Sequence, residues 1–143
     1  MPVLQVPLLS IKWTRNLRAD GTSDWCRASL QEVRANMAST NYAESLLGYV
    51  VGDVWETLPD GSSEPIAILR LDTDWYASTR HELEQLYPQL SPGGVLIVDD
   101  YGYWKGARRV TDEYLANLPE PILLQRIDHT GRCAFKPYPT RSG

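Results

Sequence analysis

Ile66-Ala-Ile-Leu-Arg-Leu-Asp-Thr-Asp74 is an apolar run that ends in two aspartates, and Val95-Leu-Ile-Val-Asp-Asp100 repeats this pattern. Each run reads as a buried strand, and the second is too uniformly apolar for a sheet with only one covered face. Ligands of open parallel sheets bind outside the carboxyl ends of the strands. If the two strands are neighbours, we therefore expect the four aspartates to converge where chemistry is usually done.

Helical patterns follow both of these strands. A capping-box spacing at Thr79-Arg-His-Glu82 opens a helix with an apolar stripe, and a second helix is expected from Lys105 to Leu118. Residues 122–127 and 132–136 read as two strands joined by a tight turn, which is the pattern of an antiparallel hairpin. The alternation predicts an α/β fold with a mostly parallel sheet, a C-terminal antiparallel hairpin and helices on both faces.

The amino-terminal part of the chain is less regular. Ser29-Leu-Gln-Glu32 has the spacing of a capping box and predicts a helix. Tyr49 to Val51 reads as a short strand stopped by Gly52-Asp53, and Val54 to Leu58 can form one helical turn. The glycine in this turn admits the close approach of a ligand, although a plain turn explains it equally well.

The composition limits the classes of protein and partner. With 143 residues, of which 43% are hydrophobic, the chain is long enough for one ordinary domain and too short for two. A formal net charge of -4 without a basic stripe argues against nucleic acid or an anionic membrane as the main partner. No apolar run approaches the roughly 18 residues of a membrane span, and the first residues carry no leader pattern. We therefore expect a cytoplasmic protein with small-molecule or protein partners.

The clustered aspartates need an explanation because like charges repel. Two full charges about 4 Å apart cost on the order of 4 kcal/mol at an effective dielectric constant near 20. A divalent cation with oxygen ligands is the simplest reason for such a cluster, and helix capping is the alternative for either pair taken alone. Asp72-Thr-Asp74 by itself is also typical of phosphotransferases and glycosyltransferases. Neighbouring strand residues point in opposite directions, so Asp99 and Asp100 cannot easily both cap a helix.

Other candidate ligand groups have weaker patterns. Four aromatic side chains flank the aspartates, namely Trp75, Tyr101, Tyr103 and Trp104. They either form a stacking wall for a flat or sugar-like ligand or simply pack at the surface. His81 and His129 have no nucleophile beside them, and we expect both to be exposed to solvent and to have no catalytic role.

Three longer stretches carry a resemblance to a known family. They are Arg70-Leu-Asp-Thr-Asp-Trp-Tyr-Ala-Ser-Thr79, Leu86-Tyr-Pro-Gln-Leu-Ser-Pro-Gly-Gly94 and Asp99-Asp-Tyr-Gly102, and their order and spacing resemble the macrocin O-methyltransferase (TylF-like) family. Further stretches extend the resemblance from about Trp25 to Pro137. It implies that residues 25–137 are the C-terminal part of a TylF-like methyltransferase domain, that 1–24 are an unassigned segment and that 138–143 are a tail.

The resemblance also implies a function. Family members have a Rossmann-like class I methyltransferase fold and use S-adenosylmethionine and Mg²⁺ to methylate a sugar hydroxyl of a glycosylated natural product. Matched residue by residue, the metal ligands fall on Asp72, Asp99 and Asp100, and Asp72 is also the position of the proposed general base. By similarity to the catechol-type methyltransferases, the turn Gly52-Asp53-Val54 lines the adenine of the cofactor. The expected partners are a small-molecule glycoside acceptor and a second copy of the chain in a homo-oligomer.

The sequence departs from the family pattern in one respect. A class I methyltransferase has an early strand that ends in an acidic, glycine-rich turn for the cofactor, whereas Gly21 is the sole glycine before Gly48. We therefore expect a truncated form of the enzyme. Two alternatives stay open: a catalytically inactive fragment that acts as a binding or oligomerisation module, and a metal-dependent glycosyltransferase or phosphotransferase that uses Asp72-Thr-Asp74.

Overall fold

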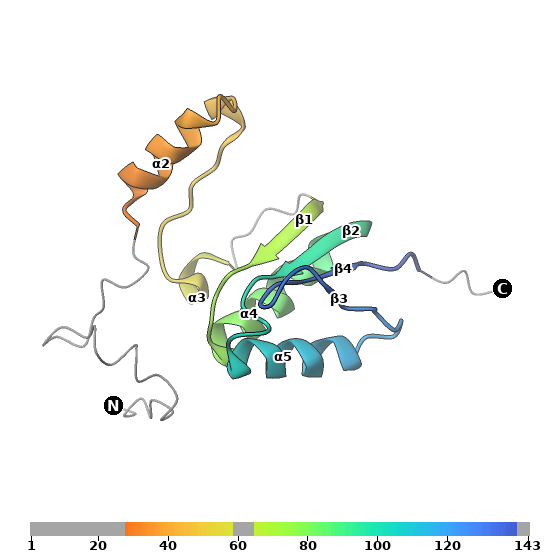
Figure 1. Cartoon of the computed structure of the whole chain (residues 1–143). Helices are drawn as coiled ribbons and strands as arrows, with labels where there is room; N and C mark the ends of the chain where they lie inside the picture. The colour runs from red at the N-terminus through yellow and green to blue at the C-terminus, as the bar shows by residue number, and fades with distance from the viewer. Residues whose placement is uncertain (1–27, 59–64, 140–143) are drawn as a thin grey trace, which may run out of the picture. The chain divides into compact units, whose positions relative to one another are not determined.

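The computed structural model describes residues 28–58 and 65–139 (Figure 1). The chain divides into two compact units, residues 1–49 and 50–143. The predicted unassigned segment 1–24 lies outside the described residues. In the described part of the chain, no helix is long and apolar enough to cross a membrane. The elements in chain order are α2 (Leu30–Ser39), η1 (Glu44–Leu46), α3 (Val54–Thr57), β1 (Ile66–Leu71), α4 (Tyr76–Leu86), η2 (Tyr87–Gln89), β2 (Leu90–Val98), α5 (Lys105–Ala116), β3 (Gln125–Arg126) and β4 (Arg132–Phe135).

The first unit confirms the predicted helix. The Ser29 hydroxyl accepts a hydrogen bond from the Glu32 backbone N–H at 3.2 Å, and the Glu32 carboxylate accepts one from the Ser29 N–H at 2.6 Å. This reciprocal pair is the capping box that the sequence predicted, and it satisfies two backbone donors that the first turn cannot use. None of the α2 residues is buried, and Arg34 of this helix lies over the ring of Tyr49.

The second unit contains a four-stranded sheet in the order β1-β2-β4-β3. Strands β1 and β2 are parallel, with Leu69 opposite Leu96 and Leu71 opposite Val98. Strand β4 is antiparallel to β2, and β3 is antiparallel to β4. The α/β class and the C-terminal hairpin are therefore confirmed. The sheet is mixed rather than mostly parallel, because the hairpin returns directly beside β2 and adds two antiparallel pairs to the one parallel pair described.

The predicted strand from Tyr49 to Val51 is absent, and these residues have no regular structure. A strand needs a neighbour to pair with its backbone groups, and β1 pairs with β2 alone among the described strands. The predicted helical turn after it is confirmed as α3. The two neighbouring segments differ because a helical turn satisfies its own backbone hydrogen bonds and a lone strand cannot.

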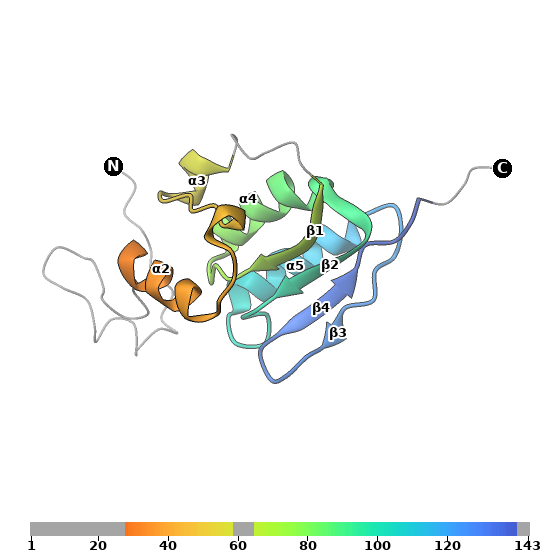
Figure 2. The ribbon, with the colours of Figure 1, turned by 90° about the horizontal axis from the view of Figure 1, so that it is seen from above.

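The hydrophobic core lies between one face of the sheet and helices α4 and α5 (Figures 1 and 2). Its fully buried side chains include Leu83 from α4 and Leu96 from β2, each 0% exposed. The opposite face of the sheet carries Ile68, which is 67% exposed, and Phe135, which is 57% exposed. Within the second unit, helices α4 and α5 therefore cover one face of the sheet, and large apolar side chains are exposed on the other.

Helix α4 begins at Tyr76, four residues before Arg80, where a helix capped by Thr79 would begin. Thr79 lies inside the helix and is buried, and its hydroxyl donates a hydrogen bond to the Thr73 carbonyl. Glu82 is also buried, and its carboxylate accepts a hydrogen bond from the Thr73 hydroxyl. The two residues therefore tie the helix to the turn that follows β1 instead of capping its first turn.

Candidate metal and cofactor site

The carboxyl ends of β1 and β2 bring the predicted aspartates together. Leu71 lies opposite Val98 in the parallel ladder, so the next residues, Asp72 and Asp99, emerge side by side. The Asp99 backbone N–H also donates a hydrogen bond to the Leu71 carbonyl at 3.0 Å, which extends the pairing by one residue. The convergence that the strand-end aspartates predicted is therefore present in the structure.

Three of these carboxylates have the spacing of a cation site. One oxygen each from Asp72, Asp99 and Asp100 lies within 4.8 Å of the others. Asp72 is exposed, while Asp99 and Asp100 are half-buried, so an ion could reach the group from solvent. The donor set consists of hard carboxylate oxygens, which is the ligand chemistry that Mg²⁺ prefers in proteins. The residues present therefore fit a magnesium ion.

The electrostatics of the cluster reflect its crowded negative charge. Burial, followed by a hydrogen bond with Asp100 and repulsion from it, raises the pKa of Asp74 to about 7. Burial also raises the pKa of Asp72, against an opposing effect of Arg70 and with a further increase from Asp99. Each raised pKa means that the folded protein resists full ionisation of the cluster. A bound cation would relieve this repulsion.

Arg70 is a member of the site that sequence reasoning missed. Its Nη2 atom lies 2.9 Å from Oδ2 of Asp72 and 2.7 Å from Oδ2 of Asp99. Residues two apart on a strand share a face, so Arg70 and Asp72 lie on the same side of β1. Arg70 is also opposite Ile97 in the ladder, which places Asp99 on that side too. A charged residue inside an apolar strand is the sequence signal that could have indicated Arg70. Its pairing with Asp99 could not be predicted, because it depends on the register between β1 and β2.

His81 and Glu82 are buried, although His81 was expected to be exposed. The imidazole is 9% exposed and stacks on the indole of Trp55 with the ring centroids 4.3 Å apart. Its Nε2 atom has no hydrogen-bond partner among the described residues. Burial raises the pKa of the Glu82 carboxyl, and its bond from Thr73 partly offsets this. The prediction failed because α3 packs against the side of α4 that the sequence pattern assigned to solvent.

The predicted cofactor turn, Gly52-Asp53-Val54, leads into α3. The Asp53 carboxylate accepts a hydrogen bond from the Trp55 N–H at 3.0 Å and so caps this short helix. A Cβ atom at Gly52 would lie 2.7 Å from the Thr57 methyl group, so the turn has no room for a larger residue. Local contacts with Trp55 and Thr57 therefore fix the conformation of this turn. The contact of the turn with the adenine of the cofactor stays a prediction.

The aromatic residues beside the aspartates divide into two groups. The rings of Trp75 and Trp104 lie 5.9 Å apart, and Tyr103 meets Trp104 edge-on at 5.2 Å. Trp75 and Tyr103 are 40% and 55% exposed. Tyr101 instead donates its hydroxyl proton to Asp112 on α5, at 2.5 Å. Trp75, Tyr103 and Trp104 therefore form a partly exposed aromatic group beside the acidic cluster. Tyr101 instead connects the loop after β2 to α5 through its hydrogen bond with Asp112.

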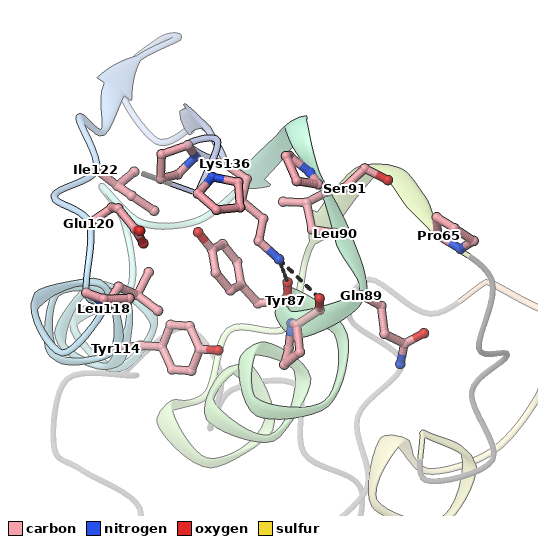
Figure 3. Close-up of a pocket in the computed structure, with 15 residues that line it drawn as sticks. Pro65, Tyr87, Gln89, Leu90, Ser91, Tyr114, Leu118, Glu120, Ile122 and Lys136 are labelled. Atoms are coloured by element: carbon pink, nitrogen blue, oxygen red, sulfur yellow. Dashed lines mark hydrogen bonds between the residues drawn. The ribbon is translucent and has the colours of Figure 1, made fainter. Parts of the chain in front are cut away.

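A cavity of 780 Å³ lies at the opposite end of β2, near Leu90 (Figure 3). Lys136 reaches across it, and its Nζ atom donates hydrogen bonds of 3.1 Å to the carbonyls of Tyr87 and Pro88. These carbonyls belong to the 3₁₀ turn after α4, so the lysine acts as a cap for that helical segment. The cavity is remote from the carboxyl ends of the strands. The ammonium group of Lys136 in this cavity is already hydrogen-bonded to protein carbonyls.

The chain is similar in sequence to known O-methyltransferases. The sequence profile of the macrocin O-methyltransferase (TylF) family matches residues 7–136, so the match begins before Trp25. The chain is similar to demethyldecarbamoylnovobiocin O-methyltransferase from Streptomyces niveus, with 36% identity over 103 residues, 72% of this chain and 39% of that enzyme. It is also similar to 8-demethyl-8-(2,3-dimethoxy-alpha-L-rhamnosyl)-tetracenomycin-C 4'-O-methyltransferase from Streptomyces olivaceus, with 35% identity over 102 residues, 71% of this chain and 39% of that enzyme.

A solved structure of an O-methyltransferase is also similar to this chain. The O-methyltransferase NovP superposes with a TM-score of 0.73 at 33% sequence identity, over 78% of this chain and 46% of NovP. The chain thus spans less than half the length of these relatives. Because the family profile covers most of the chain, the protein belongs to the macrocin O-methyltransferase (TylF) family.

Proposed function

We propose that this chain carries the metal and acceptor site of an S-adenosylmethionine- and Mg²⁺-dependent O-methyltransferase that acts on a sugar hydroxyl of a glycosylated small molecule. The observation that carries the proposal is the group of Asp72, Asp99 and Asp100, with one oxygen of each within 4.8 Å of the others at the carboxyl end of two parallel strands. The relatives support the reaction class, since both are named as O-methyltransferases and the name of the second includes a rhamnosyl group.

Each residue of the group has a proposed role. Asp99 and Asp100 would hold Mg²⁺ together with Asp72, and the ion would lower the pKa of an acceptor hydroxyl at the site. Asp72 is the proposed general base, and its carboxylate accepts the hydroxyl proton as the oxygen takes the methyl group.

The proposed cofactor contact is the turn Gly52-Asp53-Val54, where it would line the adenine. The Trp55 N–H donates a hydrogen bond to one oxygen of the Asp53 carboxylate, and the Asp53 carbonyl accepts hydrogen bonds from Glu56 and Thr57, so the second carboxylate oxygen is the Asp53 acceptor that would contact a ligand. Trp75, Tyr103 and Trp104 are the proposed stacking surface for the sugar of the acceptor. The site would thus hold donor and acceptor in the geometry that methyl transfer requires.

A second candidate function is supported by the open face of the sheet. Ile68 and Phe135 are large, apolar and more than half exposed. Exposed apolar surface of this kind favours association, so the chain could instead be an inactive module that binds a second copy of itself. A homo-oligomer and a cytoplasmic location stay predictions. The glycosyltransferase and phosphotransferase alternative loses its basis, because the family is one of O-methyltransferases.

The test is transfer of a labelled methyl group from S-adenosylmethionine to the acceptors that the relatives' names contain, demethyldecarbamoylnovobiocin and a rhamnosylated tetracenomycin. We expect labelled product with Mg²⁺, none with EDTA, and a loss of at least about 100-fold in Asp72→Asn. Glu84→Gln removes a carboxylate on the exposed side of α4, where it pairs with Arg80, and should leave the rate unchanged. A chain that does not bind S-adenosylmethionine and sediments as a dimer would support the second candidate instead.

A further inference from the structure

Arg70 places a cation inside the acidic cluster, on two of the three carboxylates that a metal ion would use. We propose that Arg70 is an intramolecular counter-ion that competes with the divalent cation for Asp72 and Asp99 and thereby sets the metal affinity of the site. This inference rests on the proposed function, because it concerns the same three carboxylates. It adds a residue that no part of the proposed mechanism uses.

The competition follows from the distances. A single atom, Nη2 of Arg70, lies 2.9 Å from Oδ2 of Asp72 and 2.7 Å from Oδ2 of Asp99, so it occupies the space between them. A Mg²⁺ ion holds its oxygen ligands at roughly 2.0–2.1 Å and demands nearly ideal octahedral geometry. An ion that bridges the same two oxygens would have to take the place of the guanidinium nitrogen. Arg70 and an ion at these two carboxylates would therefore compete for them.

Arg70 is free to move aside when an ion arrives. Its side chain is 53% exposed and lies on the open face of the sheet, where Ile68 is also exposed. Arg70 carries one charge, whereas the group of Asp72, Asp99 and Asp100 carries three when ionised, so the paired cluster still attracts a divalent cation. Arg70 thus lowers the metal affinity without closing the site, and it holds the carboxylates together when no ion is bound.

The experiment is a calorimetric titration of the chain with Mn²⁺. Arg70→Gln removes the competing charge and should bind Mn²⁺ on the order of 10-fold more tightly than the parent chain. Arg70→Lys keeps a charge but loses the planar guanidinium, so its affinity should lie between the two. The control is Arg80→Gln, which removes an arginine of similar exposure from the ion pair with Glu84 on α4 and should leave the affinity unchanged. A structural role for Arg70 alone would weaken metal binding and not strengthen it.

A thermal melt gives a second readout that does not depend on activity. In EDTA, Arg70→Gln should unfold a few degrees below the parent chain, because the carboxylates lose their counter-ion, and saturating Mn²⁺ should close this gap. If both chains bind Mn²⁺ and Arg70→Gln binds equally or more weakly, the inference is overturned while the metal site of the proposed function stands. If neither chain binds Mn²⁺, both are overturned.

Discussion

The two faces of the sheet are built from alternate residues of the same strands, yet they serve different purposes. On the covered face, Leu71 and Leu96 are 2% and 0% exposed against α4 and α5. On the open face, Ile68 is 67% exposed, and Arg70 on the same side pairs with the acidic cluster. The covered face supplies the stability that fixes the strand ends. The open face and its edge supply the charged groups that can bind a ligand.

The largest expected effect is on the covered face. Leu96→Ala removes a fully buried side chain from the centre of the sheet and should lower the free energy of unfolding by about 2–5 kcal/mol. Urea denaturation measures this change. If the free energy of unfolding falls with urea concentration at the same slope in both chains, the variant exposes as much surface on unfolding as the parent does. A loss below about 1 kcal/mol would mean that this face is not the core of the molecule.

A smaller, pH-dependent effect is expected at the edge of the open face. The pKa of Asp74 is raised to about 7, so between pH 4 and 7 the folded chain binds more protons than the unfolded chain. In EDTA, stability should therefore fall as the pH rises through this window. Asp74→Asn removes the charge and should be more stable than the parent at pH 8 by on the order of 1 kcal/mol, since solvent screens part of the effect.

The pH series also contains its own control. At pH 4 the Asp74 carboxyl is protonated in the folded chain, so the parent and Asp74→Asn should unfold at nearly the same temperature. A constant difference across the whole range would instead indicate a packing effect of the amide. A variant less stable than the parent at pH 8 would contradict the crowded-charge description of the cluster.

The smallest effect on stability is expected at Ile68, an exposed residue of β1, the strand that also carries the core residues Leu69 and Leu71. Ile68→Thr keeps a β-branched side chain on β1 and changes a residue that is 67% exposed. Thermal denaturation should therefore show a change within about 0.5 kcal/mol. In sedimentation, a parent chain that self-associates and a variant that does so less would show that this face is an interface between copies. A loss comparable to that of Leu96→Ala would remove the distinction between the two faces.

The sequence predicted the features that depend on local pattern. The capping box of α2, the strands β1 and β2 and the helix α5 follow from residues near one another in the chain, and the convergence of the aspartates follows from the ends of two neighbouring strands. The ion pairs of Arg70 could not be predicted, because they depend on the register that sets Leu71 opposite Val98. The burial of His81 depends on α3 packing against α4, which no local pattern encodes.

The acidic cluster at the end of β1 and β2 is proposed to bind a divalent cation. The most direct measurement is an electron paramagnetic resonance titration with Mn²⁺, in which bound ions lose the six-line signal of the free ion. We expect one bound ion per chain, competition by Mg²⁺, and loss of the site in Asp99→Asn but not in Glu84→Gln. A full free-ion signal with the chain in excess over Mn²⁺, or an equal affinity in Asp99→Asn, would show that the cluster is not a cation site.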